Sequence, residues 1–222
     1  MVFRFSKSSF LGDPNIGLYG FATDNYCLLG INPHKSVLEN LIKTIGLKPK
    51  ITTIAGTELL GLFVVGNSNG IIVPKIIEDD ELEKLKKYFN INIEVVRSRE
   101  TALGNLILCN DNGCIISRSI SRFKKIISDT LDCEVELGTV SGLNIVGSTA
   151  AVTNVGCLCH REAKEREMKN IENILKVKVD VGTVGYGSPF IKSGLIVNSK
   201  GILYAEGTTG AELGRIEEVF KK

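Results

Sequence analysis

The sequence predicts a single α/β domain made of five copies of a unit that runs strand, strand, helix, strand. Two observations lead to this prediction: a period of about 44 residues accounts for all 222 residues, and each period repeats the same order of apolar and turn patterns. One unit of this size cannot bury both its helix face and its sheet, and open sheet edges favour aggregation. The five units must therefore pack together, as a closed ring or a layered array.

A recurring pair of an apolar residue and a glycine sets the period. The glycines at 61, 104 and 147 are 43 residues apart, and a second glycine follows nine positions after each of them. The pairs are Ile16-Gly17, Leu60-Gly61, Leu103-Gly104 and Val146-Gly147, and the second glycines are Gly70, Gly113 and Gly156. Gly201, 45 residues after Gly156, extends the period to the C-terminal end. We divide the single domain, residues 1–222, into repeats at about 1–49, 50–92, 93–134, 135–178 and 179–222.

The stretch between the two glycines of a repeat predicts a β-hairpin. In the second repeat, apolar runs at 62–65 and 71–73 flank the turn Asn67-Ser68-Asn69-Gly70, and similar turns occur at 110–113 and 198–201. Asparagine favours the start of such a turn, and glycine adopts the positive φ that the turn requires. We therefore interpret these asparagines as turn residues rather than as side chains that read nucleic-acid bases.

An amphipathic helix is predicted about nine residues after each turn glycine, from apolar spacings of three and four at 38–45, 82–89, 123–127, 168–175 and 213–220. Three helices carry a capping-box signal, in which a side chain at the helix start and an acid three residues later satisfy each other's backbone amides. The predicted pairs are Ser36 with Glu39, Asp80 with Glu83, and Thr209 with Glu212. A final strand follows the first four helices. Because WD-type propeller blades have a similar period but no helix, the helices exclude that fold.

Composition and charge limit the function classes. The apolar runs are far shorter than the roughly 20 residues of a membrane span, and the N-terminal residues lack the apolar region of a signal peptide, so we expect a cytoplasmic protein. The net charge of +2 is too small for a protein that holds RNA mainly through its phosphates. The six cysteines are expected to be reduced and mostly buried.

Several local motifs, taken together and in order along the chain, resemble the archaeal members of the translation initiation factor 6 family. They are Ile16-Gly17 with the run 25–28, Val73-Pro74-Lys75 before the acidic run 78–82, 101–105 with Asn110-Asp111, Val146-Gly147-Ser148 with 153–158, and 207–213. The resemblance implies a pentein fold, an α/β propeller with five ββαβ subdomains around a pseudo-fivefold axis. It also implies a non-catalytic factor, without cofactor or metal, that binds the large (50S) ribosomal subunit and sterically prevents joining of the small (30S) subunit.

The same resemblance implies the partners and the binding face. The expected contacts are ribosomal protein uL14 and the sarcin–ricin loop of the rRNA, with no membrane or DNA partner, and a closed ring is expected to be a monomer. The resemblance places the Leu103-Gly104-Asn105 motif at the uL14 contact. Equivalent positions in successive repeats should lie at one end of a ring. The candidate ribosome-binding residues are Gly61, Leu62, Gly104, Asn105, Gly147, Ser148 and Thr149. The alternative that Asn105 only caps a loop remains open.

Two other function classes were weighed. A guanidine-modifying pentein enzyme needs a cysteine nucleophile in its last unit and a histidine base, whereas the last cysteine here is Cys159 and the histidines are His34 and His160. A generic RNA-binding module needs interleaved basic and aromatic residues, and only 6% of the residues are aromatic.

Two possible ligand motifs are incomplete. Cys157, Cys159 and His160 give at most part of a zinc site, since a structural site needs four ligands. The glycine-rich run 182–187 does not continue into the Gly-Lys pair of a phosphate loop, because Ile191 precedes Lys192.

Overall fold

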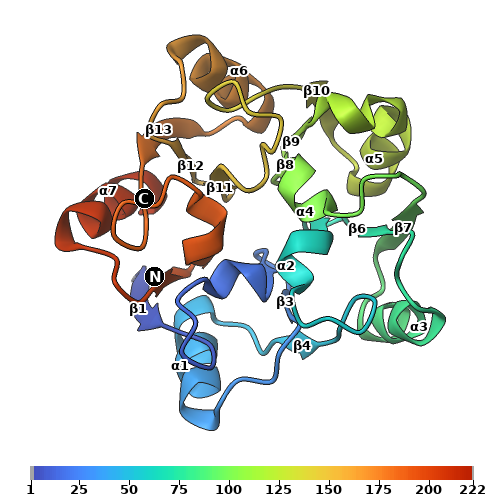
Figure 1. Ribbon diagram of the computed structural model, residues 1–222, viewed down its shortest axis with the longest axis horizontal. Helices are drawn as coiled ribbons and strands as arrows, with labels where there is room; N and C mark the ends of the chain where they lie inside the picture. Colours follow the sequence, from blue (N-terminus) through green and yellow to red (C-terminus); the bar gives the residue numbers. More distant parts are fainter. Residues whose placement is uncertain (1–2, 222) are drawn as a thin grey trace.

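The computed structural model describes residues 3–221 as five similar three-stranded sheets around a central axis (Figure 1). In each sheet the first strand pairs antiparallel with the middle strand, and the third strand pairs parallel with it. The sheets are β2 (Gly20–Ala22), β3 (Cys27–Leu29) and β4 (Lys50–Ile51); β5 (Val65–Gly66), β6 (Gly70–Pro74) and β7 (Asn92–Val96); β8 (Ile107–Cys109), β9 (Gly113–Ile116) and β10 (Glu134–Leu137); β11 (Ala150–Val152), β12 (Gly156–His160) and β13 (Lys178–Gly182); and β14 (Leu195–Asn198), β15 (Gly201–Ala205) and β1 (Arg4–Ser8). The predicted pentein fold is confirmed.

One long helix per unit lies on the outside of the ring (Figure 1). These helices are α1 (Lys35–Ile45), α3 (Asp79–Tyr88), α5 (Lys124–Leu131, preceded by the 3₁₀ turn η2, Arg118–Phe123), α6 (Glu165–Leu175) and α7 (Gly210–Phe220). Four of them pack against the sheet of the preceding unit: α1 against β1 and β15, α5 against β6 and β7, α6 against β9, and α7 against β12. The apolar core is accordingly shared between neighbouring units, since one cluster joins Val65 and Ile72 of the second unit to Ile127 and Leu131 of α5. A single unit therefore has no complete core of its own.

The ring is closed by pairing residues from the two ends of the chain. No strand follows α7 within the described residues, and the third strand of the fifth sheet is β1. Its register runs from Arg4 opposite Gly201 to Ser8 opposite Ala205. The sequence predicted a third strand only after the first four helices and did not assign residues 4–8. The predicted repeat boundaries fall close to the third strands β4, β7, β10 and β13, each of which belongs to the sheet of the hairpin before it.

Two of the three predicted helix starts are wrong by one or two residues. Helix α1 starts at Lys35, with Ser36 already inside it, and α3 starts at Asp79, with Glu81 rather than Glu83 returning to the backbone amide of Glu78. The acidic run before α3 offers several similar spacings, and Glu81 is selected because it also binds a neighbouring turn, as described below. The third signal is confirmed: the Thr209 hydroxyl accepts from the Glu212 amide, and the Glu212 carboxylate accepts from the Thr209 amide.

No helix of residues 3–221 is long and apolar enough to cross a membrane.

Candidate functional site

Short helical turns surround the axis at one end of the ring, which we call the glycine end. They are η1 (Ile16–Leu18), α2 (Leu60–Phe63), α4 (Leu103–Leu106), the turn at 146–148, and η3 (Ile191–Gly194). Figure 1 shows α2 and α4 side by side next to the axis, and the two are in contact. Each turn leads into the first strand of its unit. The predicted site residues of the second, third and fourth units lie on these turns, except Thr149, which directly follows the turn at 146–148.

Backbone from neighbouring units approaches the glycines at this end. A Cβ atom on Gly61 would lie 2.1 Å from the carbonyl oxygen of Gly17, one on Gly104 would lie 2.2 Å from that of Gly61, and one on Gly147 would lie 2.3 Å from that of Gly104. No real Cβ tolerates such distances, and the atom in the way is backbone each time. These glycines are required by the closure of the ring, and all three are buried.

The remaining predicted site residues differ in how far they reach the surface. Leu62, Asn105 and Ser148 are half-buried, whereas Thr149 is fully buried and its hydroxyl donates to the carbonyls of Ile145 and Val146. Hydrogen bonds link the turns through backbone atoms, from the Gly147 amide to the Asn105 carbonyl (2.9 Å). Within residues 3–221 the Asn105 side chain makes no hydrogen bond, and Ala102 is the N-cap of α4. The side-chain amide of Asn105 therefore caps no loop in the described structure and is available to a partner.

The rim of the glycine end carries exposed apolar side chains on tight turns. Leu11 and Tyr186 are 82% and 84% exposed, and both adopt positive φ, 51° and 69°, immediately before a glycine. Leu143 and Phe190, on or next to equivalent turns, are 38% and 43% exposed. These side chains stand on separate turns around the rim and offer apolar area at several points of this end.

Carboxylates at the helix starts hold three of these turns. Glu212 accepts hydrogen bonds from the Gly187 amide (2.8 Å) and from the Thr183 hydroxyl (2.8 Å), in addition to the cap of α7. Glu81 binds the turn at 55–56 in the same way, and Glu167 binds the turn at 141–142. Burial alone would raise the pKa of each carboxyl, but these hydrogen bonds outweigh it, so that the pKa of all three lies below the ordinary value. For Glu81 and Glu167, the signal in the sequence that was missed is an acidic residue at the third position of the helix.

The fifth unit departs from the glycine pattern. Lys192 occupies the position that Gly147 has in the fourth unit, 45 residues earlier. Its side chain turns inward, and its Nζ donates to the Gly104 carbonyl at 2.7 Å. Burial lowers the pKa of the Lys192 ammonium to about 8. From the sequence, Lys192 entered only the rejection of a phosphate loop, although its position 45 residues after Gly147 indicates that it belongs to the glycine pattern.

The hairpin turns lie at the opposite end of the axis, which we call the turn end, and there side chains connect the units. The Asn110 side chain donates to the carbonyls of Thr153 (3.1 Å) and Leu175 (2.8 Å), and Asn67 and Asn198 make equivalent bonds. A second layer of polar side chains crosses the axis: Ser68 with Asp111, Asp111 with Asn154, Asn154 with Asp24, and Asp24 with Ser199. All five units contribute one residue to this layer, which closes the turn end.

The cysteines and histidines do not form the arrangement that a cysteine nucleophile requires. The Cys159 thiol donates to the Asp180 carbonyl at 3.3 Å, and burial raises its pKa to about 12. The neighbouring His160 ring accepts from the Glu162 amide at 3.1 Å. Within residues 3–221 no three His, Cys, Asp or Glu side chains are grouped so that they could hold a metal ion.

The closed ring, with one end built by glycines and the other by hydrogen-bonded turns, defines a pentein of five ββαβ units. Residues 5–219 match the model of the eIF-6 family. The chain is 39% identical over 220 residues to translation initiation factor 6 of Methanocaldococcus jannaschii, with 96% of each chain covered. It is 42% identical over 215 residues to the same factor of Staphylothermus marinus, with 95% of this chain and 94% of the relative covered. The chain belongs to the eIF-6 family.

Proposed function

We propose that this protein is a cytoplasmic, monomeric translation initiation factor that binds the large (50S) ribosomal subunit and prevents its association with the small (30S) subunit. The action is steric and involves no catalysis. Family membership supports the role in translation, since the relatives are named translation initiation factor 6. The partners that we propose on the large subunit are ribosomal protein uL14 and the sarcin–ricin loop region.

We choose the glycine end as the binding face because of the exposure and the hydrogen bonding of its side chains. Asn105 is half-buried, makes no side-chain hydrogen bond within residues 3–221, and stands on a turn whose backbone is fixed by the neighbouring unit. A rigidly placed amide offers both a donor and an acceptor at little entropic cost. Leu62 and Ser148 stand at the equivalent places of adjacent units. The buried Gly61, Gly104, Gly147 and Thr149 contribute by fixing the shape of this face.

The charge balance favours a mixed interface. The chain has 27 Lys and Arg against 25 Asp and Glu, so phosphate contacts alone would not supply the affinity. Exposed Leu11 and Tyr186 at the rim offer apolar area to a protein surface. We therefore propose that the protein partner, uL14, provides the larger part of the contact.

The substitution Asn105→Arg tests the proposed face. A central interface residue can carry 2 kcal/mol or more, so we expect roughly thirtyfold weaker cosedimentation with purified large subunits and restored subunit joining in a sucrose gradient. The melting temperature should stay nearly unchanged, because the half-buried Asn105 side chain makes no hydrogen bond within residues 3–221. Asn90→Arg is the matched control: it makes the same change of charge at an exposed position after α3 and should bind normally.

Three results would count against the proposal. If the Asn105 variant unfolds, the side chain is structural; if it folds and binds like the control, the contact face lies elsewhere on the ring. If the unaltered protein comigrates with small subunits, or does not affect joining, the proposed function itself is wrong.

A further inference from the structure

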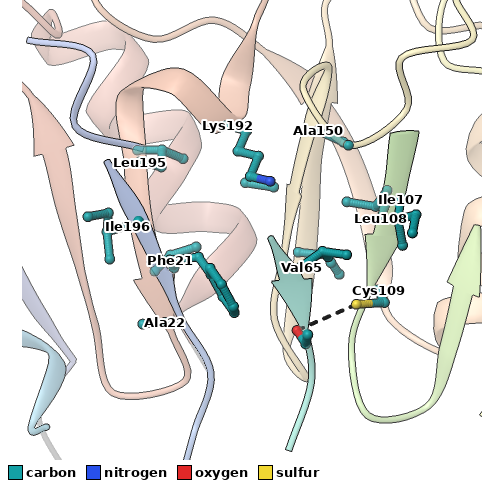
Figure 2. Close-up of a pocket in the computed structure, with 16 residues that line it drawn as sticks. Phe21, Ala22, Val65, Ile107, Leu108, Cys109, Ala150, Lys192, Leu195 and Ile196 are labelled. Carbon is teal, nitrogen blue, oxygen red and sulfur yellow. Dashed lines mark hydrogen bonds between the residues drawn. The ribbon is translucent and has the colours of Figure 1, made fainter. Parts of the chain in front are cut away.

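A cavity of about 80 Å³ lies on the axis of the ring, enclosed by the innermost strands of the five units (Figure 2). Its lining is mostly glycine, alanine and branched apolar residues, among them Val65, Ile107, Leu195 and Ile196. A buried water needs roughly 10–15 Å³ measured in this way. The cavity therefore has room for a small ion with a few water molecules, but not for a nucleotide or another large metabolite.

One charged side chain enters this apolar space. Figure 2 shows Lys192 extending into the cavity, and within residues 3–221 it is the only charged side chain of the lining. The ammonium has three donors, and the structure gives it one protein acceptor, the Gly104 carbonyl. Cys109, the other titratable group of the lining, donates its thiol proton to the Gly66 carbonyl. The carboxylates of Asp24 and Asp111 belong to the polar layer of the turn end, where the hydroxyls of Ser199 and Ser68 donate to them.

A cation in an apolar cavity without a counter-charge is energetically unfavourable, and it creates a strong preference for an anion. The Lys192 ammonium keeps its proton at pH 7, because burial lowers its pKa only to about 8. Two of its donors point to no protein acceptor among the described residues, and the surrounding wall is neutral. Charge and volume together favour a small anion.

We propose that the axial cavity is a binding site for a small inorganic anion such as chloride, held by the Lys192 ammonium. The anion supplies the missing counter-charge and accepts the donors that Gly104 leaves unused. Since Lys192 belongs to the fifth unit and Gly104 to the third, the bound ion stabilises contacts across the axis. The site does not depend on the proposed ribosomal function.

Thermal unfolding of the full-length protein tests the site. At pH 7 and constant ionic strength, replacing sodium gluconate by sodium chloride should raise the Tm by about 4 °C once chloride exceeds its Kd tenfold. Gluconate is too large for the cavity and controls for general salt effects. Lys192→Met keeps the length of the side chain without its charge, and the Tm of this variant should not respond to the exchange. An equal response in the two proteins would overturn the proposal.

Two further measurements do not require the variant to fold. In the unaltered protein the chloride effect should disappear by pH 10, where the amine is neutral; a constant effect from pH 7 to pH 10 would contradict a site at Lys192. Crystals grown from sodium bromide should show an anomalous peak next to the Lys192 Nζ. A cavity without bromide, or one with bromide but no chloride effect on Tm, would show that no such site operates in solution.

Discussion

The two ends of the axis share close backbone approach but differ in their side chains. At the glycine end, backbone from neighbouring units comes so close that no Cβ fits at Gly61, Gly104 or Gly147. At the turn end too, a Cβ on Gly70 would lie 2.2 Å from the Thr130 carbonyl oxygen and one on Gly113 2.1 Å from that of Ile174, but there buried side-chain amides such as that of Asn110 also connect the units.

The side chains next to these glycines differ accordingly. At the glycine end the Asn105 side chain makes no hydrogen bond within residues 3–221, although the Ser148 hydroxyl at the equivalent place donates to the Ile145 carbonyl at 3.0 Å. At the turn end the side chains themselves connect the units.

The strongest test of this comparison is to add one methyl group at the glycine end. In Gly104→Ala the new Cβ would lie 2.2 Å from the Gly61 carbonyl oxygen, and both backbones are fixed by the ring. We expect a loss of stability of about 4 kcal/mol or more, or failure to fold, measured by chemical denaturation. Gly214→Ala in α7 is the control, since nothing lies within 4 Å of its new Cβ, and alanine should stabilise that helix by about 0.5–1 kcal/mol. Equal effects would refute close approach as the role of Gly104.

The same residue type at the two ends should have unequal effects. Asn110→Ala leaves the carbonyl of Thr153 without its donor, leaves that of Leu175 with the Asn112 side chain alone, and removes the acceptor of the turn amides, so it should cost about 3 kcal/mol. Asn105→Ala at the glycine end should change stability by no more than about 0.5 kcal/mol. Denaturant midpoints of the two variants measure the difference. If the costs are similar, the Asn105 side chain has a structural role that its surroundings do not reveal.

The sequence predicted what local chemistry determines. The turn asparagines and the Thr209 cap follow from backbone requirements within a few residues. The positive φ predicted for the turn glycines is wrong, since neither Gly70 nor Gly113 adopts it; glycine is required there because a Cβ on Gly70 would lie 2.2 Å from the Thr130 carbonyl oxygen of the next unit. The sequence placed Gly104 in a motif expected to contact a partner, and did not show that the backbone of Gly61 lies against it within the ring. The closing strand β1 was missed because residues 4–8 alternate polar and apolar side chains and gain their meaning only from pairing with residues 201–205, at the far end of the chain.

The candidate site could be predicted from the sequence to about the same extent as the fold. The period brought the positions of Leu62, Asn105 and Ser148 to one end of the ring, as found. It could not distinguish the half-buried Asn105 from the buried Thr149, because exposure depends on how the neighbouring unit packs. Lys192 was missed because an isolated lysine is usually a solvated surface residue, and only the assembled ring encloses it. The ribosomal role of all seven residues stays a prediction.

Lys192 breaks the glycine pattern, and its effect on stability should depend on pH. Its folded pKa of about 8 lies below the ordinary 10.5, so the unfolded chain binds more protons between pH 8 and 10.5, and the contribution of Lys192 to stability must rise with pH across that window. In gluconate buffer the rise should amount to about 2–3 kcal/mol. Burial raises the pKa of thiols such as Cys27 and acts in the opposite direction, so the comparison with Lys192→Met isolates the effect. Parallel pH profiles of the two proteins would contradict it.

The smallest expected effect concerns the rim of the glycine end, where carboxylates hold the turns that carry exposed side chains. Glu212→Gln replaces one acceptor oxygen by a donor facing backbone amides, including that of Gly187, and should cost about 1–2 kcal/mol at pH 7. Because the folded pKa of Glu212 lies below its ordinary value, this stabilisation is present above pH 4.5 and is lost as the pH falls through the folded pKa. The variant and the unaltered protein should therefore converge in stability as the pH falls below the folded pKa of Glu212. Glu217→Gln, on the exposed side of the same helix where Glu217 pairs only with Lys221, should change stability by less than about 0.5 kcal/mol at any pH. A cost at Glu212 that persists unchanged in acid would mean that the shape of the side chain, and not its charge, holds the Tyr186 turn.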